Sequence, residues 1–137
     1  MPDRTVSSCM TRSPITVLRS TSMAQAFKIM QERGFRHLPV VDQGRLVGLV
    51  SERDLRVVEN MRAVDSAFCS VGDFILAPPY SVGPDAPVRE VARVMIERKC
   101  GSAVVVEGEK VIGLFTTTDA LAVLADVLED QARASAR

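Results

Sequence analysis

The chain has 137 residues, of which 47% are hydrophobic and 25% are charged, the balance of an ordinary globular protein. A chain of this length buries enough surface to fold without a disulfide or a structural metal. Its 17 Lys and Arg residues cancel its 17 Asp and Glu residues, which argues against a broad nucleic-acid or membrane-surface footprint.

The cysteine pattern and the N-terminus indicate the cellular compartment. Cys9, Cys69 and Cys100 are odd in number, widely spaced and without a C-x-x-C pair. They predict small buried residues in a reducing compartment rather than a disulfide or zinc framework. The first residues lack a signal-peptide core, and no apolar run approaches the roughly 20 residues of a membrane span. We therefore expect a cytoplasmic protein without a metal site.

Each half of the chain begins with a short extended segment and a helix. The extended segments PITV and PYSV each start at a proline, at residues 14–17 and 79–82. In residues 23–34 and 88–99, apolar side chains recur at helical spacing. Both stretches therefore predict an amphipathic helix.

Capping residues flank these two helices. Ser20 or Thr21 is the expected cap of the first helix, and Asp85 that of the second. Pro87 suits the first turn of the second helix, and Gly34 is well placed to end the first helix.

Two strands follow each helix. Their apolar runs are continuous rather than alternating, which suits strands that are covered on both faces. A tight turn at Gln43-Gly44 or at Gly108 separates the strands. The expected strands are residues 37–42, 45–51, 102–107 and 110–116.

The two halves are copies of one unit, related by an offset of 65 residues. GLVSERD at Gly48 returns as GLFTTTD at Gly113, without a gap from Pro14 onward. Agreement at proline, glycine and aspartate indicates a duplication. The fold class predicted is α/β (α+β), with two β-α-β-β-α units that pack as a pseudo-twofold pair. We place the first unit at 1–64, the second at 65–130, and a tail at 131–137.

The final helix is apolar almost all round from Ala120 to Leu128. Such a helix needs more cover than one small sheet supplies. We expect it to contribute both to the interface between the two units and to a homodimer.

The duplicated segments LPVVD…GRLVGLVSERDL and AVVVE…EKVIGLFTTTDAL make the chain resemble a CBS-domain pair, or Bateman module, over roughly Val6 to Leu128. The resemblance implies a stand-alone regulatory module that acts on a separate partner protein and is not an enzyme. Family members bind AMP, ADP, ATP or S-adenosylmethionine in the cleft between paired units, and they often dimerise. Some bind no known ligand and serve only as docking scaffolds. No cofactor is implied beyond the regulatory adenine nucleotide.

Ser51-x-x-Asp54 and Thr116-x-x-Asp119 have two compatible interpretations. Each pair can cap the helix that follows it. A helix N-terminus can also bind a phosphate, and a carboxylate can accept two hydrogen bonds from a ribose diol. The resemblance implies that the aspartate binds the ribose and that the hydroxyl lies near the ribose or phosphate.

The resemblance also implies further residues in the first site. Arg53, Arg36 and His37 are candidate phosphate ligands, although Arg36 is equally well explained as a solvated surface charge. Ile15 and Thr16 match the place where the family recognises adenine, largely through backbone groups. Leu38 is expected to cover the base.

The second site lacks these cations, because Gly101, Ser102 and Thr118 replace Arg36, His37 and Arg53. Arg98 and Lys99 lie nearby, and we interpret them as exposed helix-end charges. We predict a first site that favours phosphate and a second that is weaker, empty or suited to a less charged adenosyl ligand. The residues kept in the second site are Tyr80, Ser81, Ala103, Thr116 and Asp119, with Thr118 beside them.

An enzyme is the least supported class. The sequence has no G-x-x-x-x-G-K phosphate loop, no metal-ligand cluster and no second histidine for a catalytic triad. Cys100 lies beside basic residues that can lower a thiol pKa, but we favour the explanation that it is a buried cysteine at a strand start.

Overall fold

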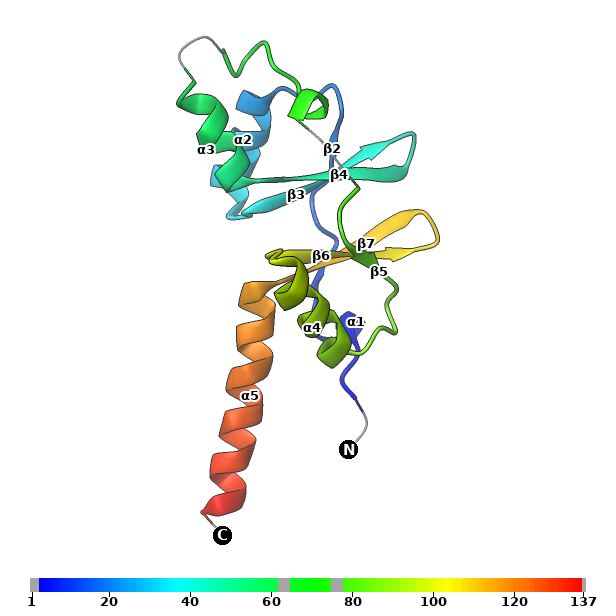
Figure 1. Cartoon of the computed structure of the whole chain (residues 1–137), viewed down its shortest axis with the longest axis vertical. Coiled ribbons are helices and arrows are strands. Elements are labelled where there is room, and N and C mark those ends of the chain that lie inside the picture. The colour runs from blue at the N-terminus through cyan, green and yellow to red at the C-terminus, as the bar shows by residue number, and fades with distance from the viewer. Residues whose placement is uncertain (1–2, 62–64, 75–77, 137) are drawn as a thin grey trace. The chain divides into compact units, whose positions relative to one another are not determined.

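A computed structural model of the chain describes residues 3–61, 65–74 and 78–136 (Figure 1). The contacts divide the chain into two compact units. The first-repeat unit comprises Ser13–Pro79 and Gly108–Val111. The second-repeat unit comprises Met1–Arg12, Tyr80–Glu107 and Ile112–Arg137.

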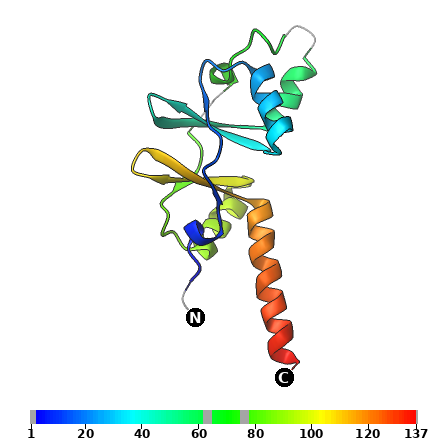
Figure 2. The same cartoon turned by 180° about the vertical axis from the view of Figure 1, so that it is seen from behind.

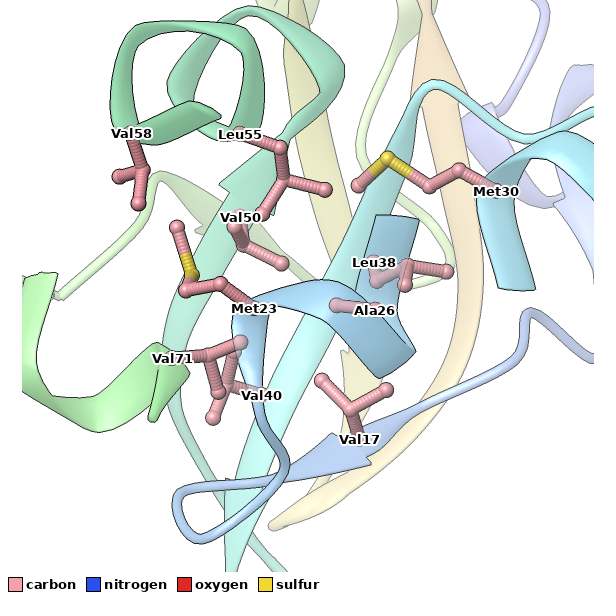
Figure 3. Packing of buried hydrophobic residues seen from close by; sticks show 10 residues of the cluster. All are labelled: Val17, Met23, Ala26, Met30, Leu38, Val40, Val50, Leu55, Val58 and Val71. Atoms are coloured by element: carbon pink, nitrogen blue, oxygen red, sulfur yellow. The ribbon is translucent and has the colours of Figure 1, made fainter. Parts of the chain in front are cut away.

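The first-repeat unit is built on a three-stranded sheet in the order β2-β3-β4. The pairing of β2 with β3 is parallel and that of β3 with β4 is antiparallel. Figure 3 shows its core, in which side chains of both helices, the sheet and η1 meet. The elements are β2 (Val17–Leu18), α2 (Met23–Arg33), β3 (His37–Asp42), β4 (Arg45–Ser51), α3 (Glu52–Glu59) and the 3-10 helix η1 (Val71–Phe74).

The second-repeat unit has a four-stranded sheet in the order β1-β7-β6-β5. The β5–β6 pairing is parallel, and β1 pairs antiparallel with β7. Its elements are α1 (Val6–Cys9), β1 (Thr11–Arg12), β5 (Ser81–Val82), α4 (Val88–Arg98), β6 (Ser102–Glu107), β7 (Lys110–Thr116) and α5 (Thr117–Ser135). The predicted α+β class and the repeated β-α-β-β-α order are confirmed.

The helix caps differ in part from the prediction. Ser22 is the N-cap of α2, because its hydroxyl accepts the Gln25 N–H at 3.0 Å. Thr21 instead accepts the Leu18 N–H in the preceding turn. Gly34 ends the helix in the left-handed conformation, with φ of 72°, as predicted.

Asp85 does not cap α4. Pro87 occupies the N-cap position and has no side chain that accepts a hydrogen bond. The first helical N–H, that of Val88, donates instead to the carbonyl of Arg4 at 2.8 Å. A backbone acceptor from the N-terminal segment therefore replaces the side-chain cap.

The segment that precedes each repeat packs into the unit of the other repeat. The segment with Val6, before the first repeat, lies in the second-repeat unit, and the segment with Val71, before the second repeat, lies in the first-repeat unit. The Val6 N–H donates to the Ala86 carbonyl, and the Val71 N–H donates to the Thr21 carbonyl, both at 2.8 Å. These two bonds are equivalent under the 65-residue offset, and both valines are fully buried. Val6 lies in the core of the second-repeat unit and Val71 in that of the first.

This exchange gives unit boundaries that differ from the expected division at residue 64, a position that lies outside the described residues. Residues 3–12 belong with the second repeat, and residues 65–74 belong with the first. At the other end, α5 continues to Ser135, so most of the expected tail at 131–137 is helical. A repeat in sequence does not show which copy its flanking segment packs against.

The last helix is less covered than expected. Ala120 and Val123 pack against the core of the second-repeat unit, but none of the residues of α5 is buried. Leu121 and Leu124 are 63% and 50% exposed. Figures 1 and 2 show α5 extending past α1 and α4 of its own unit.

Two further observations concern the cysteines and the helices. Cys9, Cys69 and Cys100 are all free, and each is half-buried rather than fully buried. Among the described residues, none of the helices combines the length and the apolar character that a membrane crossing requires.

The exchange of segments predicts where two core substitutions act. Val71→Ala should lower the free energy of unfolding by about 1 to 3 kcal/mol, because it leaves a cavity in a packed core. Amide hydrogen exchange should quicken chiefly in α2 and α3. Val6→Ala should instead quicken exchange in α4 and β6. If each substitution instead quickened exchange in the repeat that follows the valine in sequence, the assignment would be contradicted. Val57→Ala, at a side chain 54% exposed, is the matched control and should change stability by less than about 0.5 kcal/mol.

Candidate functional site

The candidate site of the first repeat begins at a helix cap. The Ser51 hydroxyl accepts the Asp54 N–H at 3.1 Å, and the Asp54 carboxylate accepts the Ser51 N–H at 3.0 Å. In the second repeat, Thr116 and Asp119 form the same reciprocal pair at 3.3 and 2.9 Å. The capping interpretation is therefore confirmed in both copies.

The cap leaves little of the α3 N-terminus free for a phosphate. The Glu52 N–H donates to the Arg36 carbonyl at 2.8 Å, and the Asp54 N–H is used by the cap. Of the first three helical N–H groups, that of Arg53 remains. A phosphate here would depend on side-chain cations more than on the helix terminus.

A cavity of about 330 Å³ lies beside this cap, within the first-repeat unit. This volume is within the range of small-molecule sites, which are roughly 300 to 1,000 Å³. His37, at the start of β3, is paired in register with Ser51, at the end of β4. The sheet thus brings together residues that the sequence proposed as phosphate ligands. The lining residues are Arg36, His37, Ser51, Glu52, Arg53 and Arg56.

Two of the lining residues were not predicted. Arg56 and Glu52 form an ion pair with 2.7 Å between Nη2 and Oε1. Their i, i+4 spacing on α3 was the sequence signal that could have found this pair. Arg56 is thereby largely neutralised, whereas neither Arg36 nor Arg53 forms an ion pair with any described residue. The cavity therefore keeps an excess of positive charge.

His37 is the titratable group most affected by this environment. Burial lowers the pKa of its imidazole below the ordinary value of 6.5. The Asp54 carboxylate opposes this shift, and the Arg36 guanidinium adds to it. Near neutral pH His37 is therefore uncharged, and a bound phosphate would favour its protonated form.

The other predicted residues of the first site do not line this cavity. Asp54 is exposed beside it, Thr16 is exposed, and Ile15 is half-buried against the core. Leu38 is fully buried in that core and does not line the cavity, and its expected contact with a base stays a prediction. The alternation of side chains along β3 turns Leu38 inward and His37 toward the cavity.

A proline distinguishes the backbone of the first site from that of the second. In the second repeat, the Val104 N–H donates to the Tyr80 carbonyl at 2.9 Å. The equivalent residues are Pro39 and Ile15, and proline has no N–H to donate. The Ile15 carbonyl consequently lacks this bond and offers an acceptor at the position expected to meet adenine.

The second site differs most at its aromatic residue. The Arg98 guanidinium lies over the Tyr80 ring, 4.9 Å from the ring centroid. Burial raises the pKa of Tyr80, and the positive charge of Arg98 partly opposes the shift. Arg98 is thus exposed, as expected, but it also makes a cation–π contact that the sequence did not predict.

The remaining residues of the second site offer few free polar groups. Ala103 is fully buried and Ser102 is 4% exposed, whereas Ser81 and Thr118 are exposed. The Asp119 carboxylate accepts from the Thr11 hydroxyl at 3.3 Å, in addition to its bonds within the cap. Thr11 was not predicted, because it lies 108 residues from its partner and has no local signal. Among the described residues, His, Cys, Asp and Glu do not gather into any group of three or more that could hold a metal ion.

The lowered pKa of His37 predicts a pH dependence of folding. Because the unfolded chain binds this proton more readily, the contribution of His37 to stability is complete above pH 6.5 and is lost as the pH falls below that value. Urea unfolding between about pH 7.5 and 5.5 should show a smaller decline in stability for His37→Gln than for the wild type. Equal slopes in the two proteins would contradict the prediction. The pKa of Asp3 is also lowered, but this carboxyl changes its protonation only below its ordinary value of 3.8, outside the pH range of the experiment.

Comparison with known proteins assigns the fold to a family. The CBS domain family matches the chain over residues 6–59 and 71–126. The inosine-5'-monophosphate dehydrogenase of Korarchaeum cryptofilum is 34% identical over 109 residues, which are 79% of this chain and 22% of that protein. The chain thus spans about a fifth of the length of this relative.

Solved structures agree with this assignment. AcuB of Vibrio cholerae, which is assigned to acetoin utilization, aligns with a TM-score of 0.81 and 30% identity, over 96% of this chain and 98% of that one. CBSX2, solved in complex with AMP, aligns with a TM-score of 0.77 and 28% identity, over 90% of this chain and 97% of that one. The chain belongs to the CBS-domain family and carries two CBS domains in tandem.

Proposed function

We propose that the chain is a regulatory module that binds an adenine nucleotide, AMP, ADP or ATP, and acts on a separate partner protein rather than as an enzyme. The observation that carries this proposal is the convergence of Arg36, His37 and Arg53 on one cavity beside the Ser51–Asp54 cap. The one lining carboxylate, that of Glu52, is paired with Arg56, and the unpaired guanidinium groups of Arg36 and Arg53 favour a phosphate. The AMP complex of CBSX2 supports an adenosine ligand for this fold.

In the first site, each chemical part of the nucleotide has a candidate partner. The guanidinium groups of Arg36 and Arg53 would bind the phosphate, and His37 would gain a proton as the anion approaches. The Asp54 carboxylate would accept the ribose hydroxyls with the oxygen that the cap leaves free. The open Ile15 carbonyl would accept the amino group of adenine.

The second site is proposed to be weaker for nucleotides. The guanidinium of Arg98, which lies near this site, is already engaged on Tyr80. A less charged adenosyl ligand, such as S-adenosylmethionine, suits it better than ATP, because phosphates would remain without partners.

Exchanging one residue between the repeats tests the phosphate role. Arg53→Thr introduces the residue of the second repeat and should weaken AMP binding roughly tenfold, the effect of losing one charge-assisted hydrogen bond. Adenosine, which lacks the phosphate, should bind both proteins alike in titration calorimetry. Arg93→Thr, which removes an exposed arginine from α4 of the other unit, is the control and should leave AMP affinity unchanged. An equal loss for AMP and adenosine would contradict a phosphate role.

A ligand-free docking scaffold is the second candidate function, favoured by the exposed apolar face of α5. Leu121, Leu124 and Leu128 follow one another at spacings of three and four and are all at least half exposed. This spacing is that of a helix–helix seam. We infer a homodimer in which this face packs against its copy. The two functions are separable, because a ligand raises the melting temperature only of a protein that binds it. No shift with millimolar AMP, ADP, ATP or S-adenosylmethionine would favour the scaffold.

The seam predicts the effect of charge on assembly. Leu124→Glu should shift sedimentation from dimer to monomer at micromolar concentration, because a charge would be buried in an apolar interface. Leu18→Glu introduces the same charge at an exposed leucine of β2 and should leave the dimer intact. A wild-type monomer at these concentrations would exclude the homodimer.

A further inference from the structure

The Asp119 carboxylate has a side-chain partner that its counterpart in the first repeat, Asp54, does not have among the described residues. Thr11 Oγ1 donates to Asp119 at 3.3 Å from Oδ1 and 3.4 Å from Oδ2. Thr116 contacts Oδ2 alone, through its N–H at 2.9 Å and its hydroxyl at 3.1 Å. The oxygen that the cap leaves free is therefore occupied by Thr11.

The first repeat cannot form this contact from the equivalent position. Under the 65-residue offset, the counterpart of Thr11 is Leu76, which lies outside the described residues. A leucine side chain has no donor, whatever its placement. Asp54 accepts the Ser51 N–H with Oδ2, and no described side chain donates to its other oxygen. The two ribose-binding candidates thus differ in a single hydroxyl group.

We propose that Thr11 is an internal competitor for the ribose position of the second site. This inference rests on the proposed function, because it takes Asp119 as the acceptor of a ribose diol. A ribose diol has two O–H donors, and together they fill both lone pairs of the carboxylate oxygen that the cap leaves free. The ligand must therefore displace the Thr11 hydroxyl. The hydrogen bond of Thr11 is long and bifurcated between the two carboxylate oxygens, so it is weak enough to be replaced. The second site is selective for ligands that can replace this bond.

Displacement of Thr11 also affects the segment that carries it. Thr11 lies in β1, a strand of two residues that pairs with β7 through Leu114 and Gly113. The next residue, Ser13, is the first of the first-repeat unit. Binding of a ribose at Asp119 and attachment of β1 therefore oppose each other, and this coupling is reciprocal. Occupancy of the second site is transmitted to the residues that join the two units.

The test is an NMR titration of the full chain with adenosine, which resolves the two sites. Amide signals of Thr117 and Thr118 report the second site, and those of Glu52 and Arg53 report the first. Thr11→Val keeps the β-branched shape but removes the hydroxyl. It should tighten adenosine binding at the second site by about three- to tenfold, the effect of a weak bond to a charged acceptor. Binding at the first site should not change.

Two comparisons sharpen the result. With 2'-deoxyadenosine, which lacks one of the two hydroxyls, the gain from Thr11→Val should be smaller. Thr117→Val removes an exposed hydroxyl of the same helix turn and should give no gain. In addition, saturating adenosine should quicken amide exchange of residues 11–12 and 113–114 in the wild type.

Several outcomes would overturn the competitor role. These are unchanged or weaker binding in Thr11→Val, an equal gain in Thr117→Val, and absence of adenosine from the second site in both proteins. Weaker binding would instead make Thr11 a ligand contact. Each of these results leaves the proposed function standing if AMP still shifts the Arg53 amide of the wild type. Loss of that response in turn would refute the proposed function independently of Thr11.

Discussion

Each CBS unit of this chain completes its core with a valine from the segment that precedes the other repeat. Val6 and Val71 are fully buried, and each donates its N–H to an equivalent carbonyl. A small sheet with two helices has little apolar surface to spare, so this added side chain and its backbone bonds matter to stability. The segment that contains Val6 also supplies the Arg4 carbonyl that accepts the first N–H of α4, and it places β1 at the edge of the sheet. The position of Thr11 beside Asp119 follows from this arrangement.

The candidate sites are built from groups that the fold already uses. The reciprocal bonds between Ser51 and Asp54 start α3, and Ser51 also lines a cavity that carries an excess of positive charge. The cap consumes N–H groups that an isolated helix terminus would offer to a phosphate. In the proposed function, arginine side chains supply the phosphate contacts that the backbone does not. In the second repeat the same cap persists without those arginines, and Thr11 occupies the carboxylate. One duplicated framework thereby gives two chemically different sites.

Local patterns in the sequence predicted the elements, and four of the predicted site residues line one cavity, namely Arg36, His37, Ser51 and Arg53. Helical spacing, the tight turns and the offset of 65 residues indicated the β-α-β-β-α order, and the Ser-x-x-Asp motif indicated the cap. Leu38 lies on the expected strand, but its side chain is fully buried in the core, because a resemblance places a residue on a strand without showing which face it takes. The caps at Ser22 and Pro87 were missed for a different reason. The acceptor for α4 comes from Arg4, far away in sequence, and no local signal identifies it.

The sequence by itself determined the duplication, the fold class and the difference in charge between the repeats, because these depend on residue identity and short-range spacing. Only the tertiary structure decided which core each flanking segment completes, which N–H groups remain free and which carboxylate is already bonded. Those features depend on contacts between residues that are 16 to 108 positions apart. At such separations, the pairing is set by the packing of whole elements rather than by the residues themselves. The Thr11–Asp119 bond is therefore visible only in the folded chain.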